Sequence, residues 1–131
     1  MTEARILVVE DNAVNRELIC DLLEAEGYTV LEATDGAEGI DLARREHPDL
    51  ILMDLQLPNV DGFTATGVLK SDPQTAHIPI IAVTAYTMKG DREKALQAGC
   101  DGYLSKPIHT RELAPTVALY LKEAARPSDP T

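Results

Sequence analysis

The chain has 131 residues, of which 44% are hydrophobic, and its formal net charge is −10 at pH 7. This length fits one domain with one core, and the acidity argues against nucleic-acid binding, since phosphate backbones recruit cations. No apolar run reaches the ~18 residues of a transmembrane helix, and the first residues lack the basic start and apolar core of a signal peptide. We therefore expect a cytoplasmic protein without a membrane segment.

The charge distribution and the two cysteines limit the kinds of site that the chain can form. Residues 1–60 hold fourteen acidic and four basic residues, whereas residues 61–131 hold eight of each. Either the first half has a solvated acidic face, or it builds an acidic site that binds a cation. Cys20 and Cys100 fit no metal or redox spacing, so we expect two reduced, structural thiols.

Short apolar strands alternate with helical patterns along the chain. In chain order we expect a strand at 6–9, a helix at 13–26, a strand at 28–31, a helix at 35–47, a strand at 50–53, a helix at 63–70, a strand at 78–83, a helix at 88–98, a strand at 102–104 and a helix at 110–126. Gly27 and Gly99 end two of the helices. Residues 127–131 are expected to form a disordered tail.

Pro115 is out of place in the last predicted helix, because an internal proline removes one backbone donor and clashes with the preceding turn. Either this helix begins later, near Ala114, or its first turn is kinked.

Five strands alternating with five helices predict a doubly wound α/β fold, in which right-handed crossovers build a parallel sheet with helices on both faces. In such open sheets the functional site lies at the carboxyl ends of the strands. The residues that follow the strands are therefore the first candidates for a site.

Polar residues follow four of the five predicted strands. Glu10 and Asp11 follow the first strand, Asp54 the third, Thr84 the fourth and Lys106 the fifth. Three carboxylates at one rim repel one another unless a cation binds or their pKa values rise. Ligands that are all oxygen favour a hard ion, usually Mg²⁺. With Lys106 and Thr84 beside them, the pattern predicts phosphorylation of an aspartate, with Asp54 as the nucleophile.

Each of these residues alone has a simpler explanation. An aspartate after a strand commonly caps a turn, two adjacent acids commonly cap the next helix, and a Lys-Pro pair is usually only a turn. Their joint occurrence at four strand ends favours the functional interpretation.

Four segments carry a resemblance to a known family: Ile6–Asn12, Asp49–Gly62, Ile80–Ala85 and Tyr103–Ile108. They resemble the receiver domain of two-component response regulators, and the resemblance covers roughly residues 4–124. Thr84–Asp91 is most similar to single-domain regulators of the DivK type. The resemblance implies a receiver domain at 1–126 with a flavodoxin-like (βα)5 fold and strand order 2-1-3-4-5.

The resemblance also implies roles for the acidic residues. Asp54 would be the phosphorylated aspartate. Asp11 and Asp54 would ligate Mg²⁺ directly (Mn²⁺ is an alternative), with the backbone carbonyl of Gln56 as a third protein ligand. Glu10 would act mainly through metal-bound water, and it departs from the aspartate that is commoner at its position.

Further roles concern the phosphoryl group and the response to it. Lys106 would pair with the phosphoryl oxygens, and its bond to Pro107 would be cis. Thr84 would donate a hydrogen bond to the phosphoryl group, with the backbone N–H of Ala85 nearby. Tyr103 would rotate inward after Thr84 moves, which would remodel the fourth helix, fifth strand and fifth helix. Alternatively, Tyr103 is a half-buried anchor at the sheet edge.

The first helix has more apolar surface than a core-facing helix needs. We therefore expect one exposed edge, although a deeply buried helix is the alternative. The resemblance implies that this edge docks a four-helix domain bearing the donor histidine, from a histidine kinase or a histidine phosphotransfer protein. The docking residues would be Val14, Asn15, Leu18 and Leu22.

Several alternatives remain at this point. The chain is expected to act as a stand-alone regulator, a monomer or weak dimer that takes part only in its own phosphorylation and dephosphorylation. It could instead be the receiver of a hybrid histidine kinase or of a multidomain regulator. A haloacid-dehalogenase-type phosphatase would need an aspartate where Gln56 stands. A flavin-binding electron carrier would need a phosphate-binding loop where Glu10 and Asp11 would repel phosphate.

Overall fold

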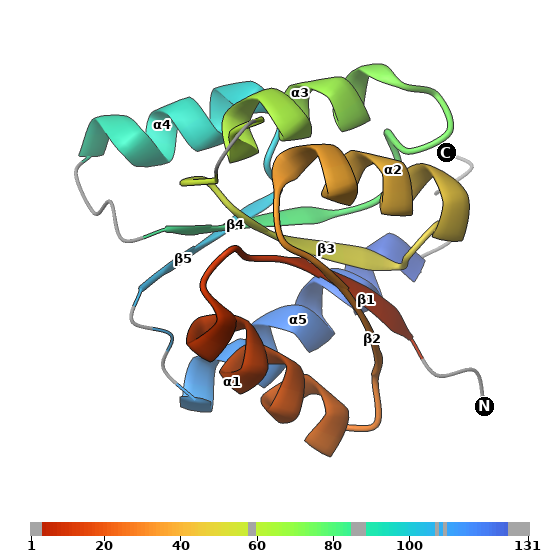
Figure 1. The fold of residues 1–131 in the computed structure, drawn as a ribbon, viewed down its shortest axis with the longest axis vertical. Helices are drawn as coiled ribbons and strands as arrows, with labels where there is room; N and C mark the ends of the chain where they lie inside the picture. Colours follow the sequence, from red (N-terminus) through yellow and green to blue (C-terminus); the bar gives the residue numbers. More distant parts are fainter. Residues whose placement is uncertain (1–3, 58–59, 85–88, 107, 109, 126–131) are drawn as a thin grey trace.

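The computed structural model describes residues 4–57, 60–84, 89–106, 108 and 110–125 (Figure 1). Strands and helices alternate along the chain, as the sequence predicts. The elements are β1 (Arg5–Val9), α1 (Ala13–Ala25), β2 (Thr29–Ala33), α2 (Gly36–Glu46), β3 (Leu50–Asp54), α3 (Gly62–Ser71), β4 (Ile80–Thr84), α4 (Lys89–Ala98), β5 (Gly102–Ser105) and α5 (Thr110–Ala125).

The five strands form one parallel sheet in the order β2-β1-β3-β4-β5, which confirms the expected topology. The chain starts in β1, adds β2 on one side and then crosses to β3 on the other side. The strand order therefore reverses between β1 and β3, and the crevice at their carboxyl ends is where such folds place their sites.

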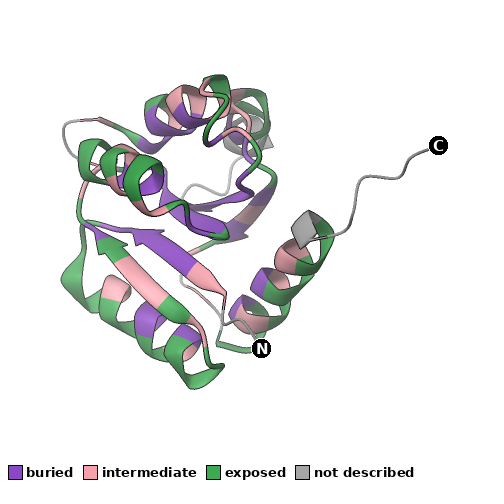
Figure 2. Cartoon of the chain, turned by 90° about the vertical axis from the view of Figure 1, so that its right-hand side faces the viewer, coloured by how far each residue is buried: buried purple, intermediate pink, exposed green. Residues whose placement is uncertain are grey.

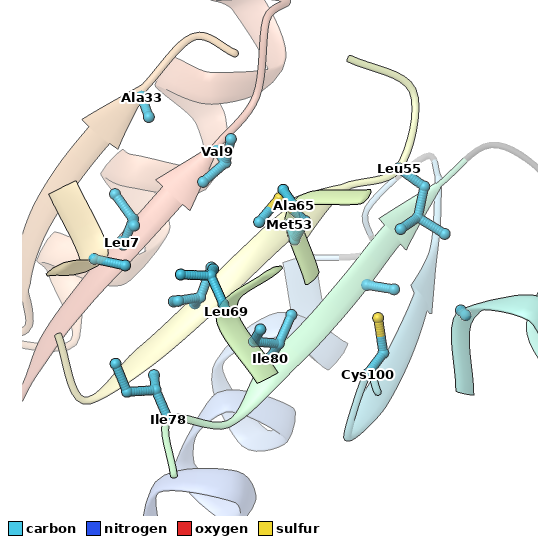
Figure 3. Packing of buried hydrophobic residues seen from close by; sticks show 14 residues of the cluster. Leu7, Val9, Ala33, Met53, Leu55, Ala65, Leu69, Ile78, Ile80 and Cys100 are labelled. Atoms are coloured by element: carbon cyan, nitrogen blue, oxygen red, sulfur yellow. The ribbon is translucent and has the colours of Figure 1, made fainter. Parts of the chain in front are cut away.

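Helices cover both faces of the sheet because alternate residues of each strand point to opposite faces. Leu7 and Val9 of β1 pack toward α2, α3 and α4, in the cluster shown in Figure 3. Ile6 and Val8 pack toward α1 and α5. Figure 1 shows these two layers of helices on either side of the sheet, and Figure 2 shows that burial is concentrated in the central strands. The two layers fix the strand ends relative to one another.

Two strands differ from their predicted limits by two residues at one end, and the other three by a single residue. The second strand begins one residue later than expected and extends to Ala33. The fourth was expected at 78–83, but β4 begins at Ile80, because the N–H of Ile78 closes a turn onto the carbonyl of Thr75 at 3.0 Å. Pro79 has no N–H to give to the sheet, although its carbonyl accepts a hydrogen bond from Ile51 at 2.9 Å.

The last helix accommodates its proline. The alternative in which this helix begins near Ala114 is wrong, since α5 begins at Thr110 and runs through Pro115. Pro115 and Arg111 are both exposed. The carbonyl of Arg111, which would lose its partner four residues on, can therefore hydrogen-bond to water.

Three further predictions concern the cysteines, membrane-spanning helices and the C-terminal tail. Cys20 and Cys100 are buried and free, as expected for structural thiols. None of the described helices is long and apolar enough to cross a bilayer. The expected tail at 127–131 lies outside the described residues.

Candidate functional site

Three carboxylates meet where β1 and β3 end. The two strands are neighbours in the sheet, with Val9 opposite Met53, so the residues that follow them lie side by side. Glu10 and Asp54 are 1% and 2% exposed, whereas Asp11 is exposed. Each of the three offers an oxygen atom, and these atoms all lie within 4.8 Å of one another. The structure thus brings the predicted acidic residues together.

The two buried acids each stabilise a turn with only part of their carboxylate. Glu10 Oε2 accepts a hydrogen bond from the N–H of Asn12 at 3.1 Å, and Asp54 Oδ1 accepts one from the N–H of Gln56 at 2.9 Å. The capping residue of α1 is Asn12, whose side chain accepts from the N–H of Asn15 at 3.0 Å. The simpler explanation is therefore correct for Oδ1 of Asp54, which accepts a hydrogen bond within a turn, whereas α1 is capped by Asn12 and not by Glu10 or Asp11. The other oxygen of each buried acid contacts Lys106.

Lys106 brings a positive charge to these acids from the end of β5. Its Nζ lies 2.9 Å from Asp54 Oδ2 and 2.7 Å from Glu10 Oε1. Its backbone N–H donates to the carbonyl of Thr84 at 2.8 Å, which ties the ends of β4 and β5 together. One lysine therefore contacts two of the three carboxylates.

Burial and neighbouring charges shift the pKa values of Glu10 and Lys106. Burial raises the pKa of Glu10, and the neighbouring Asp54 raises it further, while the contacts with Lys106 and Asn12 oppose the change. Burial alone would lower the pKa of Lys106, but its contacts with Glu10 and Asp54 outweigh burial and raise that pKa. Lys106 is therefore positively charged at neutral pH, and the surrounding carboxylates attract a further cation.

The residues fit a hard divalent cation. Glu10 Oε1 is buried and accepts no hydrogen bond of acceptable geometry within the described part of the chain, although Lys106 Nζ lies close to it. A buried oxygen in this state favours a cation as its partner. The clustered donors are all carboxylate oxygens, which suit Mg²⁺ better than a softer metal.

The remaining phosphate-binding candidates lie around the next two strands. Thr84 is fully buried at the end of β4, one strand away from Asp54. Tyr103 is half-buried on β5, opposite Ala82, and packs against the cluster under α2, α3 and α4. Ala85 and Pro107 lie outside the described residues, so the expectations for the Ala85 N–H and for a cis bond before Pro107 stay predictions.

The first helix has the exposed edge that its sequence predicts. Val14 is 76% and Leu18 42% exposed, whereas Ile19 and Leu23 are buried against the sheet. Asn15 and Leu22 are partly exposed on the same helix. The alternative of a deeply buried α1 is therefore wrong.

One residue near the site was missed by the sequence analysis. Arg16 of α1 donates from Nη1 to the backbone carbonyl of Glu10 at 2.9 Å, and its Nε lies 3.1 Å from Glu32 Oε1 of β2. No local pattern could have shown these contacts, because they join residues on different elements.

Comparison with known proteins agrees with this geometry. A profile of the family described as response regulator receiver domain matches residues 6–118. The polar-differentiation response regulators DivK of Brucella ovis and Brucella melitensis are each 50% identical to this chain over 119 residues, which cover 91% of this chain and 97% of DivK.

Solved structures lead to the same family. The receiver domain of the sensor histidine kinase PA1611 from Pseudomonas aeruginosa, described with a magnesium ion coordinated in its active-site cleft, is 40% identical with a TM-score of 0.86. It covers 92% of this chain and 99% of that one. A CheY-like receiver domain protein from Methanospirillum hungatei is 29% identical with a TM-score of 0.87, covering 94% and 97%.

These matches support neither the flavin carrier nor the phosphatase. The chain belongs to the response regulator receiver domains of two-component systems, and it is similar to the DivK regulators over nearly their full length.

Proposed function

We propose that Asp54 is the residue that receives a phosphoryl group, and that the protein signals by changing its surface in response. The contact that carries this proposal is the one between Lys106 Nζ and Asp54 Oδ2, at 2.9 Å, beside two further carboxylates. Asp54 is the only one of the three acids that is both buried and the last residue of a strand. The sheet therefore holds Asp54 in place, while its side chain contacts the positively charged Lys106.

The transfer step needs a nucleophile and a leaving group. A carboxylate oxygen of Asp54 forms the new bond to phosphorus while the phosphorus–nitrogen bond of a phosphohistidine breaks. The electron pair returns to the imidazole, which then takes up a proton. Lys106 keeps its positive charge through this step and pairs with the phosphoryl oxygens. The attacking oxygen is already oriented, because the hydrogen bond from the Gln56 N–H holds the other one.

Asp11, Asp54 and the backbone carbonyl of Gln56 would hold Mg²⁺, with Glu10 acting mainly through water. When bound, the ion supplies positive charge that neutralises the clustered carboxylates and the transferring phosphoryl group. Glu10 supports this arrangement because its buried carboxylate also contacts Lys106. The Mg²⁺ in the related receiver domain of PA1611 supports the same assignment here.

The response would start from Thr84 and Tyr103. A phosphoryl group adds about −1.5 to −2 charge and strong acceptor oxygens, which would draw the Thr84 hydroxyl toward Asp54. Tyr103 lies on the neighbouring strand, two residues before the partner of Thr84, so it can respond to space left behind Thr84. The outcome would be a changed surface on α4, β5 and α5.

The partner would be a histidine kinase or a histidine phosphotransfer protein that docks on α1. The exposed Val14 and Leu18 give an apolar patch beside the site, with Asn15 and Leu22 at its margin. The 50% identity with DivK supports a regulator of the DivK type. We further propose that its only chemistry is its own phosphorylation and dephosphorylation.

The direct test is labelling by acetyl phosphate, which needs no partner protein. Wild type should gain one phosphoryl group in the presence of Mg²⁺ and none in EDTA, and Asp54→Asn should gain none while keeping its circular dichroism spectrum. Labelling of a folded Asp54→Asn variant would show that Asp54 is not the acceptor.

The proposed switch has a separate test. Tyr103→Ala should be labelled at the wild-type rate but should respond less to phosphorylation in its affinity for a partner. If the phosphorylated and unphosphorylated forms of Tyr103→Ala differ in partner affinity as much as those of wild type, Tyr103 is only an anchor at the sheet edge.

A further inference from the structure

Arg16 joins three elements at the edge of the carboxylate cluster. It belongs to α1, donates to the backbone carbonyl of Glu10 after β1, and pairs with Glu32 of β2. Its side chain is only 19% exposed, while Glu32 is largely in water. The guanidinium is thus held against the backbone carbonyl of Glu10, in addition to its ion pair with Glu32.

Arg16 contacts the carbonyl of the peptide bond between Glu10 and Asp11, and the orientation of this peptide bond affects where Asp11 points. The N–H of Glu10 donates to the carbonyl of Ala33 in β2 at 3.0 Å, and its carbonyl accepts from Arg16. Both sides of Glu10 are therefore fixed, one by the sheet and one by α1. The carbonyl of Glu10 is also part of the peptide bond to Asp11, so its orientation bears on where both carboxylates point.

We propose that Arg16 is a positioning residue that holds the Glu10–Asp11 pair in the geometry required to bind Mg²⁺. This inference rests on the proposed function of the same site and adds a residue that does not itself touch the cation. Arginine suits the role because its planar fork serves two acceptors at fixed angles, which lysine cannot do.

The charge of Arg16 makes the inference easy to distinguish from simple electrostatics. A guanidinium near an acidic site repels a second cation, so its removal alone would strengthen Mg²⁺ binding. If Arg16 acts by orienting the Glu10–Asp11 peptide, its removal weakens Mg²⁺ binding in spite of the lost repulsion. The two roles thus predict changes of opposite sign.

The experiment is a calorimetric Mg²⁺ titration of the unphosphorylated protein, alongside a denaturant unfolding curve for each variant. Arg16→Met should raise the Mg²⁺ dissociation constant at least fivefold. The matched control is Arg44→Met, because Arg44 Nε also lies 3.1 Å from a carboxylate, that of Asp72, away from the site. Its Mg²⁺ affinity should equal that of wild type.

Two further variants separate the contacts of Arg16. Glu32→Gln leaves the contact with the Glu10 carbonyl, so the Mg²⁺ dissociation constant should change less than twofold. Arg16→Lys keeps the charge but not the fork, and should weaken Mg²⁺ binding at least twofold. Should Arg16→Met fail to fold, Arg16→Lys decides the matter, since wild-type affinity in that variant overturns the inference.

The outcomes also separate this inference from the proposed function. Unchanged or tighter Mg²⁺ binding by a folded Arg16→Met variant overturns the positioning role and leaves Asp54 as the proposed acceptor. If wild type itself binds no Mg²⁺ and takes no label from acetyl phosphate, the proposed function fails, and the positioning role fails with it.

Discussion

The two ends of the sheet use charged residues in different ways. At the amino end, cations and carboxylates are matched and tie elements together. Arg5 contacts Glu46 at 2.7 Å, and its backbone N–H donates to Asp49 at 2.7 Å. Lys70 contacts Asp101 at 2.8 Å and also donates to two backbone carbonyls, those of Ala76 and Ile78.

At the carboxyl end, by contrast, three carboxylates cluster, and Lys106 contacts two of them. Within the described residues, the buried Oε1 of Glu10 accepts no well-aligned hydrogen bond. Matched pairs contribute to folding, whereas an excess of one charge in a partly buried site costs stability unless a ligand neutralises it. The amino end therefore stabilises the fold, whereas the acidic carboxyl end is where we propose that a cation and a phosphoryl group bind.

The largest contrast is expected between the two lysines. Lys106→Met should slow labelling by acetyl phosphate about 100-fold, since it removes the cation beside the transferring group. Lys70→Met should leave labelling unchanged but lower the free energy of unfolding by about 2 kcal/mol, because a charged donor to two carbonyls is lost. Labelling rates and urea unfolding curves measure both. A large loss of labelling in a folded Lys70→Met variant would break the comparison.

A second prediction separates docking of the partner protein from the chemistry of phosphorylation at Asp54. Leu18→Glu should reduce phosphotransfer from a phosphorylated histidine protein at least tenfold, because it puts a charge into the apolar patch of α1, while labelling by acetyl phosphate persists. Leu96→Glu is the matched control, since Leu96 on α4 is 48% exposed, close to the 42% of Leu18. Equal loss of both kinds of labelling in Leu18→Glu would show damage to the site instead of to docking.

A smaller effect should appear in the pH dependence of stability, with opposite signs at the two ends. Burial raises the pKa of Glu10 above 4.5, so Glu10 contributes stability that is present below pH 4.5 and lost as the pH rises through the raised pKa. Glu10→Gln in EDTA should therefore be more stable than wild type at pH 7, and less of this advantage should remain at pH 4.5. Equal stability of the two proteins at pH 7 would contradict this prediction.

Asp72 should behave in the opposite way. The N–H of Gln74 and the Arg44 side chain hold the pKa of Asp72 below its ordinary 3.8, so its contribution to stability is present above that pH and lost as the pH falls through the lowered pKa. Asp72→Asn should be slightly less stable than wild type at pH 7 and equally stable at the acid limit of folding. Unfolding curves at a series of pH values test this prediction.

Much of the fold could be predicted because its signals are local. Continuous apolar runs marked the buried strands, and Gly27 and Gly99 marked two helix ends, where both adopt positive φ. The limits of β4 were missed because Ile78 is apolar but belongs to a turn. Pro115 left two alternatives open, because the sequence does not show that the carbonyl of Arg111 is exposed and can hydrogen-bond to water.

The site was partly predictable for a related reason. Parallel strands bring their carboxyl ends to one rim, so Glu10, Asp54 and Lys106 could be placed together from the sequence. The pairing of Lys106 with both Glu10 and Asp54, and the reach of Arg16 to the Glu10 carbonyl, depend on side-chain paths between elements. No sequence pattern specifies such paths.

The proposed function requires that the carboxylates and Lys106 at the carboxyl end of the sheet position Asp54 to accept a phosphoryl group. The most direct test is to phosphorylate the wild-type protein in Mg²⁺ and to locate the modified residue by mass spectrometry after borohydride reduction of the acyl phosphate. A single modified position, Asp54, is expected. Modification at Asp101 or another acid instead, with Asp54 unchanged, would contradict it.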